Sequence, residues 1–278
     1  MKKIILLIIT ITQWITSYSQ VPPDSRDIRN FKIVDESTIR ITYSLNFKLS
    51  PNDKEFRNDT RMVQIGKQII KDYSGIVYTA DSIATSNIKK GAANAPTLQE
   101  IVFPYDIFNN YESGKTLLTY RTFLNGPVLR YFDIQPVFNW ELKEGNQKIM
   151  GYNCQPATTH FAGRDYTAWF TMELPINAGP YKFNGLPGII LKVEESNKYF
   201  VWTAIGISNI KEPIVLHEFE TDQKCTKKQA DEIIKNMYTK PYTFINSISN
   251  GIMIYVDGQW KKGTSENEAP IPYEPLEK

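Results

Sequence analysis

The chain has 278 residues, with 32 lysines and arginines against 30 aspartates and glutamates, which leaves a formal net charge of +2. The basic residues are scattered along the sequence and form no stripe, which excludes the electrostatic footprint of a nucleic-acid-binding protein. This length suits one large β domain or two small ones, and a core of that size does not need disulfide bonds.

Residues 1–19 have the pattern of a secretory signal peptide. Lys2 and Lys3 form the charged region, a short apolar run follows, and Ser17 and Ser19 place small side chains before the predicted cleavage point. Removal of this segment takes away two of the 32 basic residues, so the mature chain carries 30 basic and 30 acidic residues and no net charge. No cysteine near the cleavage point offers a lipoprotein anchor, and no later stretch is apolar enough to span a membrane. We therefore expect an exported protein, periplasmic or secreted.

The first part of the mature chain predicts a flexible lead-in and then strands. Residues 20–37 are polar, and strict apolar alternation over residues 38–49 predicts a half-buried strand. Residues 61–80 predict two further strands, divided at residues 72–75. A loop over residues 86–97 is expected from its glycine, asparagine and proline content.

The middle of the chain predicts more short strands. Residues 99–142 contain several aromatic runs separated by turn residues, and the inward-facing positions change parity after Pro156, which predicts a bulge. Residues 199–205 are apolar on both faces, which predicts a strand in a central or covered position.

One helix is predicted near the C-terminus. Thr226 and Gln229 form a capping box, and apolar residues then recur at helical spacing. Residues 261–278 have the composition of a disordered tail. The whole pattern predicts a mainly β (α+β) fold, with a large antiparallel curved sheet or partial barrel and one or two packed helices. A single domain is expected over residues 38–260.

The stretch Gly185-Leu186-Pro187-Gly188 predicts a rigid turn ahead of a strand. Proline and glycine suit the two central positions of a type II turn, which would give Gly188 a positive φ. Such a turn would direct Leu186 either into the core or into a groove, and the two glycines allow a backbone or a ligand to approach closely. The structural interpretation is favoured over a binding groove, and catalysis is the least favoured.

Two other residues are candidates for a binding site. Arg164 and Trp169 lie on an adjoining turn and strand, and this pair of residue types is common at binding sites. Ordinary packing is the alternative interpretation.

The cysteines and histidines suggest little chemistry. Cys154 and Cys225 are a candidate disulfide in an oxidising compartment. Cys154 and His160 could form a nucleophile and its base, although a core cysteine is the preferred interpretation. Together with His217 these residues show no metal-ligand spacing, and we expect no metal and no cofactor.

Residues 38–205 resemble the GLPGLI family, exported proteins of Bacteroidota with no established biochemical function. The resemblance rests on the following residues: Ile65–Lys67, Asp81-Ser82, Trp140, Ile149–Gln155, Ala157–Thr159, Gly163-Arg164, Ala168–Thr171, Gly179–Phe183 and Gly185–Ile190. Three positions depart from the family pattern, namely Pro156, Ala162 and Ile189. Asp81-Ser82-Ile83 also resembles the O-glycosylation tripeptide of exported Bacteroidota proteins, with a chance match as the alternative.

Two classes of function follow from this sequence. The first is a non-catalytic binding module of the cell envelope, for an apolar small molecule or lipid, or for an outer-membrane protein partner. The second is a periplasmic hydrolase, which would need His160 or His217 beside a nucleophile or metal. A purely structural envelope protein is a third alternative.

Overall fold

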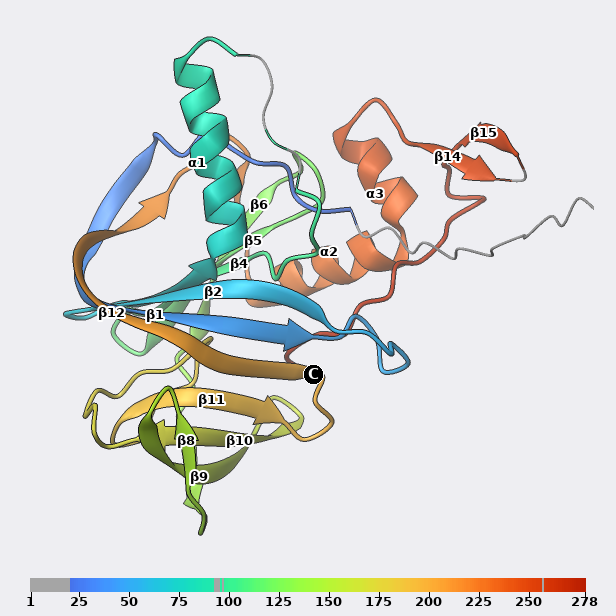
Figure 1. Cartoon of the computed structure of the whole chain (residues 1–278). Coiled ribbons are helices and arrows are strands. Elements are labelled where there is room, and N and C mark those ends of the chain that lie inside the picture. The colour runs from blue at the N-terminus through green and yellow to red at the C-terminus, as the bar shows by residue number, and fades with distance from the viewer. Residues whose placement is uncertain (1–20, 93–95, 97, 257) are drawn as a thin grey trace, which may run out of the picture.

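One large curved sheet is the main feature of the computed structural model, which describes residues 21–278 except 93–95, 97 and 257 (Figure 1). Within these residues the sheet has 13 strands, in the order β13-β6-β5-β4-β3-β2-β1-β12-β11-β10-β9-β7, with β8 pairing β9 off this path. The outermost strands β13 and β7 are not partners in this order, so the sheet is not closed into a barrel. The strand bounds are β1 Phe31–Phe47, β2 Arg57–Gly66, β3 Ile70–Ser74, β4 Tyr105–Glu112, β5 Lys115–Arg121, β6 Val128–Ile134, β7 Glu141–Leu142, β8 Gln147–Ile149, β9 Tyr152–Phe161, β10 Arg164–Thr171, β11 Ile189–Glu195, β12 Phe200–His217 and β13 Asp222–Lys224.

The predicted mainly β fold with a large curved sheet is confirmed. The described ladders are antiparallel except that between β13 and β6, which is parallel, so the sheet is mixed at one edge. The predicted signal peptide lies outside the described residues. No helix among the described residues is long and apolar enough to cross a membrane.

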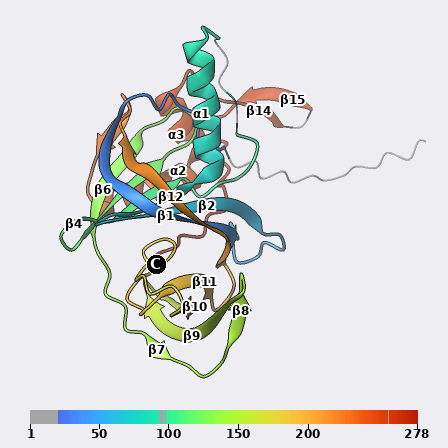
Figure 2. The same cartoon turned by 60° about the vertical axis from the view of Figure 1, so that its left-hand side comes forward.

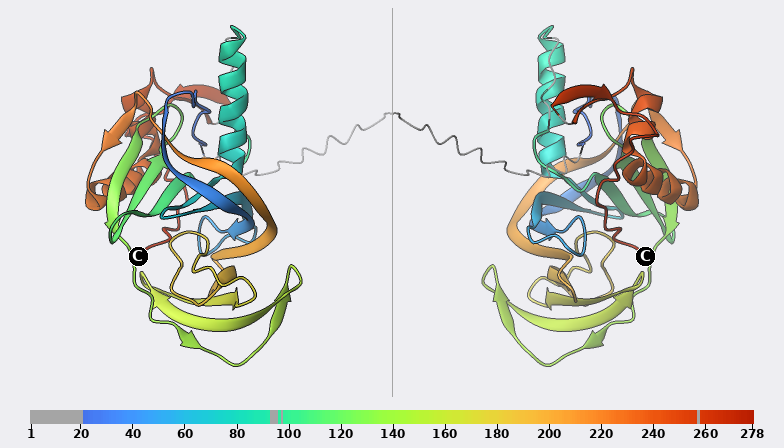
Figure 3. Two further views of the ribbon diagram at one scale, coloured as in Figure 1. Left: turned by 90° about the vertical axis from the view of Figure 1, so that its left-hand side faces the viewer. Right: turned by 90° about the vertical axis from the view of Figure 1, so that its right-hand side faces the viewer.

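The two longest strands, β1 and β12, lie side by side in the middle of the sheet. β1 buries alternate residues from Ile41 to Phe47, as the predicted strand over residues 38–49 requires. β12 lies between β1 and β11, which matches its apolar character on both faces. Three register shifts interrupt the β1–β12 pairing, and such irregularities bend and twist a ladder. This pair joins an upper half, with β2–β6 and the helices, to a lower half formed by β7–β11 (Figures 2 and 3).

Among the described residues, three helices accompany the large sheet. α2 (Lys227–Thr239) begins with the predicted capping box, since the Thr226 hydroxyl and the Gln229 side chain both make the expected bonds. α3 (Pro241–Ile248) follows α2 and was not predicted. α1 (Gly75–Lys89) replaces the expected second strand of residues 61–80 and part of the expected loop. The β-branched residues of its first turn obscured the helical pattern in the sequence. The helix is capped by the Ser74 side chain, and its buried face contains Val77, Ala80 and Ala84.

α1 and α2 cover opposite faces of β3–β6. Asp81 of α1 pairs with Arg121 of β5, whereas Tyr238 of α2 meets the neighbouring Tyr120. Successive side chains of a strand point to opposite faces, so these contacts place the helices on different sides. The face with Tyr120 is continuous with the main core of the molecule.

The C-terminal residues are packed, in contrast to the expected disordered tail. β14 (Met253–Val256) and β15 (Gln259–Lys262) form a separate small sheet. The chain then returns to the junction between the two halves of the large sheet, where Leu276 is buried (Figure 3). We call residues 271–278 the C-terminal strap. The polar composition of residues 261–278 predicted disorder, because only a few of these residues make the apolar and charged contacts that hold the strap.

Both cysteines are free thiols, so the candidate disulfide is not formed in this structure. Cys154 lies on β9 and Cys225 follows β13, close to opposite ends of the strand order. The arrangement of the sheet therefore separates two residues that sequence spacing alone could not place.

Candidate functional site

The GLPG stretch forms a turn that buries Leu186 and leaves Pro187 exposed. Leu186 is buried in the main core, and the indole nitrogen of Trp140 donates a hydrogen bond of 2.7 Å to the carbonyl oxygen of Asn184. The residue with positive φ is Gly185, at +93°, so the prediction that Gly188 takes this conformation was wrong.

Gly188 is required for a different reason, which is close backbone packing. A Cβ atom at this position would overlap the carbonyl oxygen of Thr171 at the end of β10. Pro187 remains exposed between Leu186 and Gly188. The turn therefore fixes the start of β11 against β10, which agrees with the favoured structural interpretation.

The segment before this turn fills the inside of the curved sheet. Residues 178–183 are all buried, and the ring of Phe183 lies 4.9 Å from that of Tyr166 and 5.8 Å from that of Trp202. The backbone of Tyr181 is held at both ends, since its amide donates to Asp72 and its carbonyl oxygen accepts from the side chain of Asn109. The aromatic interior is thus largely occupied by the protein's own loop.

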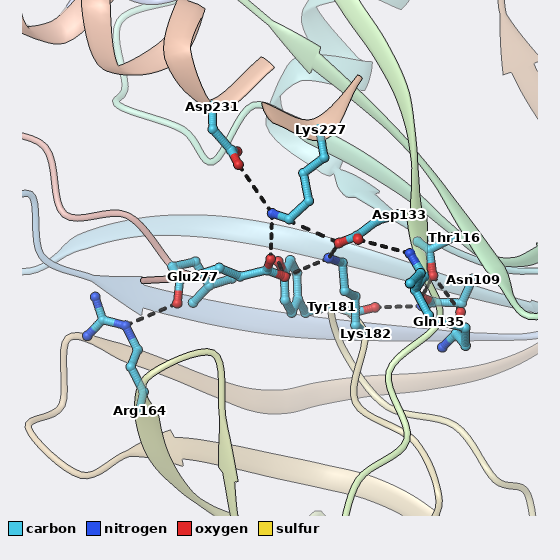
Figure 4. A network of polar contacts seen from close by, with 12 residues as sticks. Asn109, Thr116, Asp133, Gln135, Arg164, Tyr181, Lys182, Lys227, Asp231 and Glu277 are labelled. Carbon is cyan, nitrogen blue, oxygen red and sulfur yellow. Dashed lines mark hydrogen bonds and ion pairs between the residues drawn. The ribbon is translucent and has the colours of Figure 1, made fainter. Parts of the chain in front are cut away.

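This loop delivers a buried lysine to a polar network at the edge of the core (Figure 4). Lys182 is 1% exposed, and its Nζ lies 2.7 Å from a carboxylate oxygen of Asp133 on β6 and 2.6 Å from Glu277 of the strap. Lys227, the first residue of α2, lies 2.8 Å from the other carboxylate oxygen of Glu277. Tyr181 completes the set, because its hydroxyl donates to the same Glu277 oxygen as Lys182.

The charges of this network are strongly coupled. Burial by itself would raise the pKa of Glu277, but the adjacent Lys182 and Lys227 ammonium groups outweigh it and lower the pKa to about 2. Burial would likewise lower the pKa of Lys227, yet its bonds to Glu277 raise it. Glu277 is therefore ionised at neutral pH and binds the strap to the loop and to α2.

Arg164, a predicted site residue, anchors the strap from the other side. Its guanidinium is buried and donates to the carbonyl oxygens of Leu276 and Pro275 and to the carboxylate of Glu274. The carboxylate of Glu195 lies 3.6 Å away. This residue is thus a structural clamp for the strap.

Trp169 does not share a site with Arg164. The β9–β10 register is regular from Arg164 to Phe170, and residues five apart in a strand point to opposite faces. Trp169 is half-buried on the face that carries Pro156, beside Gly145. The structure therefore separates the two residues that the sequence had suggested as a pair.

A cavity of about 540 Å³ lies where β4–β6, α2, the loop and the strap meet. Most of its wall is aromatic or aliphatic, and Lys182, Lys227, Asp231 and Glu277 form a charged cluster within it. The aromatic members are Tyr105, Tyr131, Tyr181, Tyr238 and Tyr273, and the aliphatic members are Leu118, Ile234, Ile271 and Leu276. Of these residues, only Tyr181 belongs to the motifs that carry the family resemblance. The others lie in the aromatic runs of residues 99–142, in the amphipathic helix and in the expected tail. One local feature of the sequence pointed to this region, namely Lys182 between two aromatic residues in a segment rich in glycine and proline.

The tyrosines of the cavity are ordered and neutral. The rings of Tyr238 and Tyr273 are stacked at 4.2 Å, so α2 and the strap are joined by an aromatic contact. Burial, followed by neighbouring charges or hydroxyls, raises the pKa of Tyr131 and Tyr181 well above the usual value. These hydroxyls therefore remain available as hydrogen-bond donors at any physiological pH.

The other candidate residues do not assemble a reactive site. Cys154 and His160 are six residues apart on β9, about 20 Å at the usual strand rise. Burial raises the pKa of the Cys154 thiol, which disfavours the nucleophilic thiolate, and His160 is exposed beside Asp165. Among the described residues, no group of three or more His, Cys, Asp or Glu side chains could hold a metal ion. Ser82 lies in the middle of α1 and bonds the carbonyl oxygen of Tyr78.

Comparison with known proteins adds a family of unknown function. A family model described as "Protein of unknown function (Porph_ging)" matches residues 162–192, which include Arg164, Lys182 and the GLPG turn. No curated protein matches the chain. Two solved structures of PNGF-II, in different space groups, are similar in part, with 15% and 16% identity and TM-scores of 0.44 and 0.46. Each match covers 71% of this chain but 32% of the PNGF-II chain.

Proposed function

We propose that this protein is a non-catalytic binding module for an apolar small molecule, which binds in the cavity between β4–β6, α2 and the C-terminal strap. The observation that carries this proposal is the cavity itself, with a volume of about 540 Å³ and a wall of tyrosine and aliphatic side chains. Small-molecule sites have volumes of about 300–1,000 Å³ and are mostly apolar with a few placed polar groups. We further propose a GLPGLI-type protein exported to the periplasm, on the basis of the leader pattern and the sequence motifs.

The wall of the cavity suits an elongated apolar molecule. Leu118 and Ile234 face it from β5 and α2, and the tyrosine rings offer flat surfaces with hydroxyls at their edges. Transfer of apolar area from water to such a wall contributes about 25 cal/mol for each Å² that is buried. Affinity would therefore come chiefly from the body of the ligand.

A protein partner at residues 174–188 is less well supported. That alternative requires an exposed patch, whereas residues 178–183, Leu186 and Gly188 are buried. An outer-membrane partner at another surface stays a prediction. A hydrolase is not supported by the separated positions of Cys154 and His160.

The test combines native mass spectrometry with a matched pair of substitutions. The mature chain, purified gently from the periplasm of a Bacteroidota host, should carry an extra mass that lipid extraction removes. The extracted protein should then bind the fluorescent probe N-phenylnaphthylamine saturably. Leu118→Trp should weaken this binding about tenfold or more by filling the cavity. Leu117→Trp is the control, since Leu117 is equally buried but belongs to the opposite face of β5.

Circular dichroism must show that both variants fold. If Leu118→Trp does not, Ile234→Phe on α2 replaces it as the cavity-filling variant. Absence of saturable probe binding, or an equal loss in the cavity variant and the Leu117→Trp control, would overturn the proposed function.

A further inference from the structure

Glu277 of the strap places a carboxylate in the charged cluster of the cavity, where three donors from other segments converge on it. We propose that the ligand of this cavity is an amphiphile with a single carboxylate, whose head group takes the position of the Glu277 carboxylate on Lys182, Lys227 and Tyr181. This inference rests on the proposed function, because it names the chemical class of the molecule that the cavity binds.

The socket for this carboxylate is already formed. Tyr181 Oη and Lys182 Nζ donate to Oε1 of Glu277 at 2.5 and 2.6 Å, and Lys227 Nζ donates to Oε2 at 2.8 Å (Figure 4). Both oxygens of the Glu277 carboxylate therefore accept hydrogen bonds, and a ligand carboxylate in the same position would use the same donors. Lys182 is 1% exposed, so its ammonium group has been taken out of water, and the carboxylates of Asp133 and Glu277 compensate for its burial.

The local charge count limits the head group to one negative charge. Lys182 and Lys227 supply two positive charges, and the fixed carboxylates Asp133 and Asp231 lie within 4.0 Å of one or both of them. Glu277 adds a third negative charge. With Glu277 these five groups carry a net charge of −1. A ligand carboxylate that replaces Glu277 keeps this net charge, whereas a phosphate dianion would make it −2.

The strap is held mainly by side-chain contacts, of which that of Glu277 is one. Residues 271–278 belong to no helix or strand, and the strap's own amides make two described backbone bonds, from Ile271 to Tyr238 and from Lys278 to Ala162. The remaining anchors are side-chain contacts, chiefly those of Arg164 and Glu277. A ligand head group needs to displace only the Glu277 side chain, while Arg164 and the stacking of Tyr273 on Tyr238 continue to hold the strap. A ligand can thus compete with the strap for the socket.

The apolar wall lies beside the socket. Tyr181 and Lys182 line the same cavity as Leu118, Tyr131 and Ile234. A molecule with its carboxylate on Lys182 would therefore have its hydrocarbon body against these side chains. Glu277 then competes with the ligand's carboxylate for the socket, but it does not compete with the hydrocarbon body for the apolar wall.

The experiment compares decanoate with decanol, which share a hydrocarbon chain and differ in the head group. Dissociation constants are measured for the full mature chain by displacement of N-phenylnaphthylamine. Decanoate should bind more tightly than decanol. Glu277→Gln should raise this preference about tenfold, because it removes the competing charge from the socket. Lys227→Gln should reduce it about fivefold or more, since it removes one of the two cations.

Glu274→Gln is the matched control. Glu274 is a carboxylate of the same strap, but it pairs with Arg164 and lies outside the socket. This variant should leave the ratio of the two dissociation constants unchanged. If decanol binds and decanoate shows no preference, or if the Glu277→Gln and Glu274→Gln ratios are equal, the head-group inference is overturned while the proposed function stands. If neither compound binds, both fail.

Discussion

Nζ of Lys182 lies 2.6 Å from Oε1 of Glu277, although the two residues are 95 positions apart in the sequence. This contact joins the loop before the GLPG turn to the C-terminal strap. The cavity wall includes both segments, so their ion pair joins two parts of that wall.

Acid should release the C-terminal strap. The pKa of Glu277 is lowered from 4.5 to about 2, against the effect of burial, by Lys182 and Lys227. A carboxylate with a lowered pKa in the folded state contributes stability that is fully present above its unfolded pKa and is lost as the pH falls through the folded pKa. On the order of 3 kcal/mol should therefore disappear between about pH 4.5 and about pH 2.

Hydrogen exchange of the strap amides, corrected for intrinsic rates, measures this release. Protection of residues 271–278 should fall as the pH decreases through this window. Glu277→Gln should show weak protection that does not change over the same range. Equal protection of the wild-type strap at about pH 5 and about pH 3 would contradict the prediction.

Gly188→Ala should destabilise the protein by about 3 kcal/mol or more, because a methyl group would overlap the Thr171 carbonyl oxygen. Gly206→Ala on β12 is the control, since its added Cβ would meet Thr42 at 3.6 Å, an ordinary contact distance. That change should stay within about 1 kcal/mol. Urea denaturation of the two variants gives the comparison, and a similar small effect for both would show that the close approach at Gly188 is dispensable.

Arg164→Met should cost about 3 to 5 kcal/mol, because it leaves the buried Glu195 carboxylate without its cation. It should also increase hydrogen exchange in the strap, since the bonds to Pro275 and Leu276 are lost. The matched surface change is Arg29→Gln, which breaks an exposed ion pair and should cost less than about 1 kcal/mol. A strap that keeps its protection in Arg164→Met would show that Arg164 is no clamp.

His217 should make the protein less stable in mild acid. Burial, and then the charge of Lys71, lower its pKa from 6.5 to about 4. The unfolded chain therefore binds a proton that the folded chain does not, and up to about 3 kcal/mol is lost as the pH falls from about 6.5 to about 4.

His217→Phe should remove this part of the pH dependence, since the ring packs between Phe31 and Phe219. The comparison is made by urea denaturation at about pH 7 and about pH 4.5. His160→Gln, at an exposed position, should behave like the wild type. If His217→Phe loses as much stability in acid as the wild type does, groups other than His217 cause the acid sensitivity.

Local sequence patterns predicted several elements correctly. The Thr226–Gln229 capping box and the alternation over residues 38–49 depend on neighbours within a few positions, and both features are present in the structure. α1 was missed because its first turn is rich in β-branched residues, while its cap at Ser74 is a single hydroxyl contact. The GLPG turn was predicted, but positive φ was assigned to Gly188 instead of Gly185, since the packing against Thr171 is non-local.

The sequence by itself determined the fold class, helix α2 with its cap and the turn at residues 185–188. Hydrophobic periodicity, helix capping and turn formation each depend on residues that are near neighbours in the chain. Only the tertiary structure decided which residues form the cavity and its socket. Tyr181, Lys182, Lys227 and Glu277 meet because the 13-stranded sheet curves around the loop and returns the strap to its junction. Contacts across about a hundred residues depend on the path of the whole chain, so the spacing of these side chains in the sequence carries no trace of them.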